Sequence, residues 1–213
     1  MIATGMTTRS ERLAAIVLAC IGLLALGLQY YLRLREAQGV SWGLGTLRYL
    51  SYFTAQANIL VVLMLLAFAL RSKIEEWTVH PFERSAIASY IAVVAAVHLC
   101  SPSPPAQGAQ WLADALLHCL MPLGYLAFWL FVMRKGGLRW YDPLLWMIYP
   151  AFFLVFVLVH GRFTGFYPYP FIDVTTIGYG RMMLNALAEA AGFLLAGYAV
   201  LIASRLLAKR EPV

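Results

Sequence analysis

Charged residues are scarce in this sequence, and their scarcity excludes an ordinary water-soluble domain. Only 12% of the 213 residues are Asp, Glu, Lys or Arg, while 62% are hydrophobic. A typical soluble domain is about 25% charged and about 45–50% apolar. Too few charged side chains are available to cover a water-exposed surface, so we expect most of the surface to face lipid. At this length we expect a single membrane domain over residues 1–213.

Cysteine is also rare, and the cysteines show no metal-binding or disulfide pattern. Cys20, Cys100 and Cys119 lie in or beside apolar runs without the paired spacing of zinc sites. We therefore expect small buried apolar residues, and we predict no disulfide and no cofactor. The net charge of +6 comes from short basic clusters between apolar runs. That pattern orients membrane proteins, so it indicates neither a nucleic-acid nor a protein partner, only membrane lipids.

Long hydrophobic runs, by contrast, recur along the whole chain. Each run of about 20 residues is long enough to cross a bilayer. In lipid such a run must close its backbone hydrogen bonds internally, so it forms a helix. The sequence therefore predicts an all-α bundle of six transmembrane helices. The predicted spans are 12–32, 47–70, 84–100, 111–133, 143–161 and 180–206.

The distribution of Lys and Arg predicts that both chain ends are cytoplasmic. Eleven basic residues would then lie inside and five outside, as the positive-inside rule requires. The bias of 13 Arg to 3 Lys is typical of a high-GC prokaryote, so we expect a bacterial inner membrane. The inner residues are Arg9, Arg12, Arg71, Lys73, Arg84, Arg134, Lys135, Arg139, Arg205, Lys209 and Arg210, and the outer ones are Arg33, Arg35, Arg48, Arg162 and Arg181.

Polar side chains gather near the outer end of five predicted helices. The second, fourth and sixth spans each carry a polar i,i+4 pair on one face, and Thr54, His118 and Asn185 of these pairs lie roughly 8–11 Å below the outer boundary. Histidines end the third and fifth spans at the same depth. Polar groups are costly inside a membrane, and by default they suggest a functional site. The residues are Thr54 and Asn58, Asp114 and His118, Asn185 and Glu189, His98, and His160.

Thr54, His118 and Asp114 supply the three groups of nucleophilic acyl transfer. A hydroxyl becomes nucleophilic when a base accepts its proton, and a third group orients that base. We expect Thr54 to be the nucleophile and His118 the base, with Asp114 one turn away holding the imidazole. Asn58 or Asn185 would donate to the developing oxyanion. We expect Glu189 to be protonated or paired with Arg181 or Asn185.

Other interpretations use the same residues and stay open at this stage. Polar side chains can serve only as hydrogen bonds between helices, and such a bundle could bind or transport lipid without catalysis. His98, His118 and His160, with Asp114 nearby, would suit zinc with one open position. Two of those histidines would suit a haem. The chain has no sequence-local metal motif, so no metal ligand is predicted.

The segment after the fifth span cannot be helical. Pro168 and Pro170 impose an extended backbone on the residues that precede them. Aromatic rings and an acid at the outer interface suit either a lid over the polar cluster or an aromatic belt. We predict that Tyr167, Tyr169 and Asp173 form the rim of the site.

Three segments carry a likeness to a known family. They are Leu47–Leu50 with Tyr52–Asn58, Trp111-Leu112 followed by His118 and Pro122, and Thr164–Asp173. In these segments the chain resembles the androgen-induced-type integral membrane threonine hydrolases, whose animal members cleave fatty acid esters of hydroxy fatty acids. The resemblance implies a threonine nucleophile opening the second helix and a histidine base in the fourth. Those roles fall on Thr54 and His118, so we expect a lipid esterase acting on a fatty-acyl ester. The supporting residues are Asp114, Asn58, Asn185, Glu189, His98, His160 and Arg48.

Overall fold

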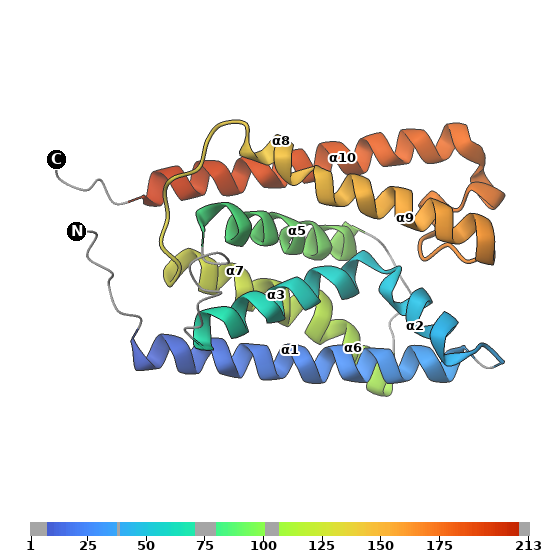
Figure 1. Ribbon diagram of the computed structural model, residues 1–213, viewed down its shortest axis with the longest axis horizontal. Helices are drawn as coiled ribbons and strands as arrows, with labels where there is room; N and C mark the ends of the chain where they lie inside the picture. The colour runs from blue at the N-terminus through green and yellow to red at the C-terminus, as the bar shows by residue number, and fades with distance from the viewer. Residues whose placement is uncertain (1–7, 38, 71–79, 101–106, 209–213) are drawn as a thin grey trace.

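The protein is an all-helical bundle that is apolar enough to cross a membrane (Figure 1). The computed structural model describes residues 8–37, 39–70, 80–100 and 107–208. Within these ranges no strand occurs, and six helices are long and apolar enough to span a bilayer. The predicted fold class is therefore confirmed. The spans are Arg9–Glu36, Phe53–Leu70, Pro81–Cys100, Gly108–Phe131, Asp142–Thr164 and Val174–Leu207.

The spans run back and forth, so the first and last helices have their free ends at the same end of the bundle (Figure 1). This arrangement agrees with two chain ends on one side of a membrane. Four of the basic residues expected there, Arg71, Lys73, Lys209 and Arg210, lie outside the described residues.

The elements are α1 (Arg9–Glu36), α2 (Trp42–Leu50), α3 (Phe53–Leu70), α5 (Pro81–Cys100), α6 (Gly108–Ala115), the π-helical turn η1 (Leu116–Leu120), α7 (Met121–Phe131), α8 (Asp142–Trp146), α9 (Ile148–Thr164), the 3-10 turn η2 (Pro170–Ile172) and α10 (Val174–Leu207).

Small residues allow α1 to pack closely against the centre of the bundle. Ala15, Ala19 and Gly22 are buried and share one face of α1. Small residues are typical of contacts between membrane helices, because lipid provides no hydrophobic driving force for association and close packing must replace it. A Cβ on Gly22 would lie only 2.5 Å from Val62 and 2.7 Å from Met121. Gly22 is therefore the point where α1, α3 and α7 meet.

Replacing Gly22 by valine is expected to destabilise the bundle. The added side chain has no space between α3 and α7, and overpacking of this kind costs about 1–3 kcal/mol. Thermal unfolding followed by circular dichroism in detergent should show a lower midpoint. Gly27→Val is the matched control on the same helix, because a Cβ added at Gly27 would have no atom within 4 Å. Equal midpoints for the two variants would contradict this description of the packing.

The predicted span 47–70 is not one helix, and this correction places the candidate site. The helix stops after Leu50, and a new helix starts at Phe53. Gln56 explains the break, because its Nε2 donates to the Leu50 carbonyl at 2.6 Å and its Oε1 accepts from the Tyr149 hydroxyl at 2.6 Å. A carbonyl orphaned at the end of α2 is thereby satisfied. As a result, Thr54 lies in the first turn of α3.

The last span is also longer than predicted, starting at Val174 and not at residue 180. Asp173 caps its N-terminus by accepting from the Thr175 backbone N–H at 2.9 Å. Gly178 interrupts the helix with a φ of 73°, a left-handed conformation that glycine adopts at little cost. This interruption separates a short first turn from the long helix that crosses the bundle.

The cysteines were wrongly predicted to be buried. Cys20, Cys100 and Cys119 are free thiols on the exposed surface of the bundle. Inside a run that is apolar on every face, sequence periodicity cannot separate the lipid-facing side from the packed side. Their apolar surroundings in the sequence therefore indicate lipid contact as readily as burial.

Candidate active site

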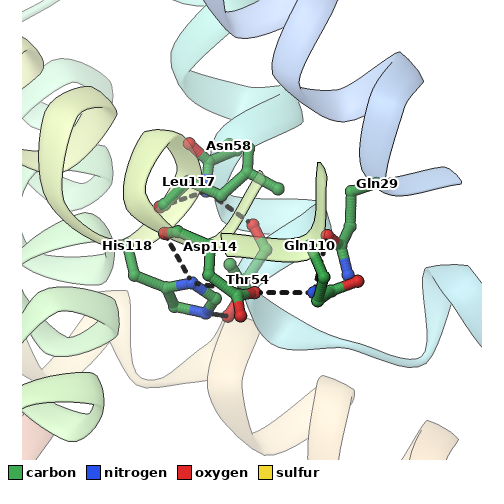
Figure 2. Close-up of polar contacts among 7 residues, drawn as sticks. All are labelled: Gln29, Thr54, Asn58, Gln110, Asp114, Leu117 and His118. Atoms are coloured by element: carbon green, nitrogen blue, oxygen red, sulfur yellow. Dashed lines mark hydrogen bonds and ion pairs between the residues drawn. The ribbon is translucent and has the colours of Figure 1, made fainter. Parts of the chain in front are cut away.

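The Thr54 hydroxyl and the His118 imidazole face each other between α3 and η1 (Figure 2). Thr54 Oγ1 lies 3.3 Å from His118 Nε2. Thr54 is the second residue of α3, and His118 is the middle residue of the π-helical turn. Single π turns inside α-helices are rare and occur frequently at functional sites. The structure thus brings together the two residues that the sequence singled out from different helices.

The other nitrogen of His118 determines the direction of this hydrogen bond. Nδ1 lies 3.1 Å from the backbone oxygen of Asp114, and a carbonyl can only accept, so Nδ1 carries the hydrogen. In the neutral imidazole Nε2 then holds the lone pair. The Thr54 hydroxyl must therefore donate to Nε2. This is the arrangement in which a base can remove the proton of a nucleophile.

The Asp114 carboxylate does not orient the imidazole as predicted. Its Oδ1 lies 4.0 Å from His118 Nδ1, farther than the backbone oxygen of the same residue. The carboxylate instead accepts from Gln110 Nε2 at 2.9 Å, and that amide also donates to Gln29 Oε1 at 3.2 Å (Figure 2). The group that orients the imidazole is thus the backbone carbonyl of Asp114. The Asp114 carboxylate is held by Gln110 of α6, which is bonded in turn to Gln29 of α1.

Gln29 and Gln110 were missed in the sequence. Gln29 is buried on α1, a helix that otherwise presents small and apolar residues to the core. A lone glutamine inside a membrane span is costly unless it is hydrogen-bonded, and this cost could have identified it. Gln110 gave no such signal, because it lies near the start of its helix.

His98 stacks on the face of His118. The two ring centroids are 4.5 Å apart and the planes differ by only 17°. His98 comes from the last turn of α5, so three helical segments converge on the imidazole. The stacked ring limits rotation of His118 and keeps Nε2 directed at Thr54.

His160 belongs to a different pair, with the opposite proton direction. Ser51 Oγ donates its only hydrogen to the Leu47 carbonyl at 2.8 Å. Its contact with His160 Nδ1 at 3.2 Å must then be one in which the imidazole donates. His160 therefore cannot take a proton from Ser51 through this nitrogen, and the buried pair connects α9 to the end of α2. The expectation that His160 joins the cluster at His118 was wrong.

The zinc and haem interpretations do not fit this geometry. No group of three or more His, Cys, Asp or Glu side chains is placed to hold a metal ion within the described parts of the chain. His160 bonds to Ser51, so the three predicted histidine ligands do not converge. His98 and His118 lie face to face at 4.5 Å, which leaves no space for a haem between them.

The amides that were predicted as oxyanion donors are used elsewhere. Asn58 Nδ2 donates to the Thr54 carbonyl at 2.9 Å and to the Leu117 carbonyl at 3.1 Å, which uses both of its hydrogens. Asn58 therefore fastens η1 to α3 beside the reactive pair (Figure 2). Asn185 Nδ2 donates to the Phe171 carbonyl at 2.7 Å and so holds the segment before α10.

Glu189 has neither of its predicted partners. The side chain is half-buried on α10. Among the described residues its carboxylate forms no ion pair with Arg181 and no hydrogen bond with Asn185, whose amide is bonded to Phe171. The depth predicted for Glu189 from the sequence therefore does not bring its carboxylate into contact with Thr54 or His118.

Tyr169 reaches the site from the predicted rim. Its hydroxyl oxygen accepts from the Phe53 backbone N–H at 2.8 Å and lies next to Thr54. Burial raises the pKa of Tyr169 to about 12, so the phenol keeps its proton at physiological pH. Because the oxygen accepts from Phe53, the O–H remains available to donate toward Thr54. Tyr169, and not Asn58, is thus the candidate hydrogen-bond donor to an oxyanion formed beside Thr54.

The other two rim residues have structural contacts. Tyr167 packs over Gly161, where an added Cβ would overlap the tyrosine ring. Asp173 caps α10 through its bonds to Thr175. The backbone is extended at Tyr169, as predicted, but the prediction of no helix was wrong for Pro170–Ile172, which form the 3-10 turn η2 because proline suits the first position of a helical turn. Tyr169 lies between the contacts of Tyr167 and Asp173.

Comparisons with family models, with curated proteins and with solved structures find no significant match to this chain. The resemblance to the membrane threonine hydrolases therefore stays a prediction. The candidate site rests on the contacts of Thr54, His118 and Tyr169 themselves.

Proposed function

We propose that this protein is an intramembrane lipid esterase in which Thr54 attacks a fatty-acyl ester and His118 acts as the base. The observation that carries the proposal is the direction of the hydrogen bond from Thr54 Oγ1 to His118 Nε2. Among the described residues, two hydroxyls near the break between α2 and α3 contact a histidine of another helix: Thr54 contacts His118, and Ser51 contacts His160. Only in the first pair does the hydroxyl donate to the histidine. The family resemblance of the sequence supports the same two residues.

In the first half of the proposed reaction, Thr54 Oγ1 forms a bond to the ester carbonyl carbon while its proton passes to His118 Nε2. The carbonyl electron pair moves onto the oxygen. Tyr169 is placed to donate to that oxyanion, and the positive end of the α3 dipole lies at the same point. When the tetrahedral intermediate collapses, the alcohol oxygen leaves and takes the proton from Nε2.

In the second half, water replaces the alcohol. His118, again neutral, accepts a proton from the water as its oxygen attacks the acyl–Thr54 ester. Collapse of the second tetrahedral intermediate releases the fatty acid and returns the proton to Thr54. The bond from Nδ1 to the Asp114 carbonyl holds the ring in one tautomer through both halves.

The surroundings suit a substrate that is mostly apolar. The site lies within the spans, near the end of the bundle opposite its two free helix ends (Figure 1). The His118 side chain is 22% exposed, so a reacting group can reach it. With cytoplasmic chain ends, this position is the outer half of a bacterial inner membrane. An ester bond next to long acyl chains fits this place.

The direct test is turnover of p-nitrophenyl palmitate by protein in phosphatidylcholine nanodiscs. We expect many equivalents of p-nitrophenol per chain, and an acyl adduct on the peptide containing Thr54 after acid quenching and mass spectrometry. Bound palmitate ester without release of p-nitrophenol would contradict the proposal and favour a lipid-binding or lipid-transport protein.

Replacing Tyr169 by phenylalanine is expected to slow turnover by about 10²–10³-fold, the usual effect of removing one oxyanion donor. The ring is retained but the Phe53 N–H loses its acceptor, so kcat should fall together with a modest drop in the melting temperature, and rates are compared well below that midpoint. Steady-state kinetics on p-nitrophenyl palmitate measure the effect. Tyr167→Phe is the matched control in the same segment and should behave like wild type. A similar kcat for both variants would remove Tyr169 from the mechanism.

A further inference from the structure

A small cavity lies beside the candidate active site, at the end of the bundle that carries α2. Its volume is about 170 Å³. A cavity of about 150 Å³ holds a molecule the size of benzene, so this one suits a compact polar group and is too small for a long acyl chain. We name it the arginine pocket. Its lining includes Arg33, Glu36, Arg48, Tyr52 and Phe166.

Two guanidinium groups in this pocket are fixed by aromatic rings. Arg33 lies over the Tyr52 ring and Arg48 over the Phe166 ring, each 5.0 Å from the ring centroid. The two rings contact each other edge to face, with centroids 6.2 Å apart. Cation–π contacts of this kind leave the edge of a guanidinium, with its N–H groups, open to a ligand. The two arginines are therefore held in place before any ligand arrives.

The positive charge of the pocket is only partly balanced. Glu36 pairs with Arg33 at 2.9 Å, but Arg48 forms no ion pair within the described residues. The Nε atoms of Arg33 and Arg48 are both buried and, in the part of the chain that the structure describes, have no hydrogen-bond partner. Buried charged donors are costly when unpaired, and guanidinium N–H groups pair best with carboxylate or phosphate oxygens. The pocket is therefore suited to one further anion.

Tyrosine rings connect the arginine pocket to the Thr54–His118 pair. Tyr52 lines the pocket and also contacts the Tyr169 ring, with centroids 5.8 Å apart. A group bound between the arginines would thus be linked to the Thr54 region through the rings of Tyr52 and Tyr169.

We infer that the arginine pocket binds the anionic group, a carboxylate or a phosphate, of the amphiphile whose ester is cleaved at Thr54; this inference rests on the proposed function. Arg48 supplies the unpaired guanidinium, and Arg33 turns toward the ligand as Glu36 releases it. The apolar part of the amphiphile extends from this point into the membrane.

Native mass spectrometry in a non-ionic detergent can test the pocket without any turnover. The probes are palmitate, hexadecyl phosphate and the uncharged hexadecanol, which share one chain length and none of which is cleaved. One of the two charged probes should bind about ten- to a hundredfold more tightly than hexadecanol, as expected for charge-assisted hydrogen bonds. Palmitate as the tighter probe assigns a carboxylate, and hexadecyl phosphate assigns a phosphate.

Two substitutions should change the preference for charged probes over hexadecanol in opposite directions. Arg48→Gln should bring the charged probes to the affinity of hexadecanol. Glu36→Gln should strengthen their binding, because it removes the competing carboxylate from an exposed position where the fold tolerates change. Arg162→Gln is the matched control, since Arg162 is exposed at the same end and does not line the pocket. It should leave the preference unchanged.

Three results would overturn the inference. The first is equal binding of charged and uncharged probes to the wild type. The second is a preference that neither Arg48→Gln nor Glu36→Gln alters. The third is displacement of hexadecyl phosphate by inorganic phosphate at equal concentration, which would assign the pocket to a free anion and not to an amphiphile. Because binding is read without cleavage, a failed pocket is distinguishable from a failed esterase, which shows only as lost turnover of p-nitrophenyl palmitate.

Discussion

Replacing Thr54 by valine is expected to lower the turnover of p-nitrophenyl palmitate by on the order of 10⁶-fold, as for other enzymes that lose a nucleophile. Valine has nearly the same shape, so the packing between α3 and η1 should persist. The substitution removes the hydroxyl that donates to His118. Initial rates in nanodiscs, together with melting temperatures, separate lost chemistry from lost folding.

Two further variants make this expectation specific to Thr54. Thr54→Ser keeps the hydroxyl and should keep measurable turnover. Ser51→Ala removes a second hydroxyl that contacts a histidine, but that hydroxyl already donates to a backbone carbonyl. It should retain turnover far above that of Thr54→Val. A Thr54→Val protein with wild-type rates would end the assignment of this residue.

Replacing His118 by phenylalanine should cause a loss of the same order, on the order of 10⁶-fold. Phenylalanine can keep the stack on His98, whereas it cannot accept the Thr54 proton. In the proposed mechanism Thr54 and His118 act as one unit, so the double variant should be hardly slower than either single variant. Rates for the two single variants and the double variant, measured on one ester, test this non-additivity.

His98→Phe is the control for the stack. It preserves a ring parallel to His118 and should retain most of the activity, whereas His98→Ala should lower it by freeing the imidazole to rotate. Losses for Thr54→Val and His118→Phe that multiply in the double variant would show two independent contributions and contradict a shared proton transfer.

The membrane spans were predictable because lipid imposes one strong rule. A run of about 20 apolar residues has no alternative to a helix, and the predicted spans therefore match the helices in number and approximate position. The break after Leu50 was not predictable. It depends on Gln56 bonding across the bend and on Tyr149 from another helix, and neither contact is written in the local sequence.

The candidate site was predictable in its central pair and not in its supporting groups. Helical rise placed Thr54 and His118 at one depth, and the structure puts them in contact. Spacing on an ideal α-helix also predicted that Asp114 would hold the imidazole with its carboxylate. The π turn at η1 changes that register, and the backbone carbonyl takes the role.

Tyr169 shows the other limit of sequence reasoning. Prolines predicted an extended segment at the rim, but not which of its rings turns inward. That choice follows from the free Phe53 N–H at the start of α3, which exists only because the second span is broken. The candidate oxyanion donor is therefore a consequence of the same tertiary bend that positions Thr54.

Reaction with a lipid-like fluorophosphonate, mapped by peptide mass spectrometry, probes the Thr54–His118 pair without any assumption about the natural ester. We expect one label per chain on Thr54 in the wild type and no label in Thr54→Val or His118→Phe. A label on Ser51, or labelling of Thr54 that persists in His118→Phe, would contradict the proposed mechanism.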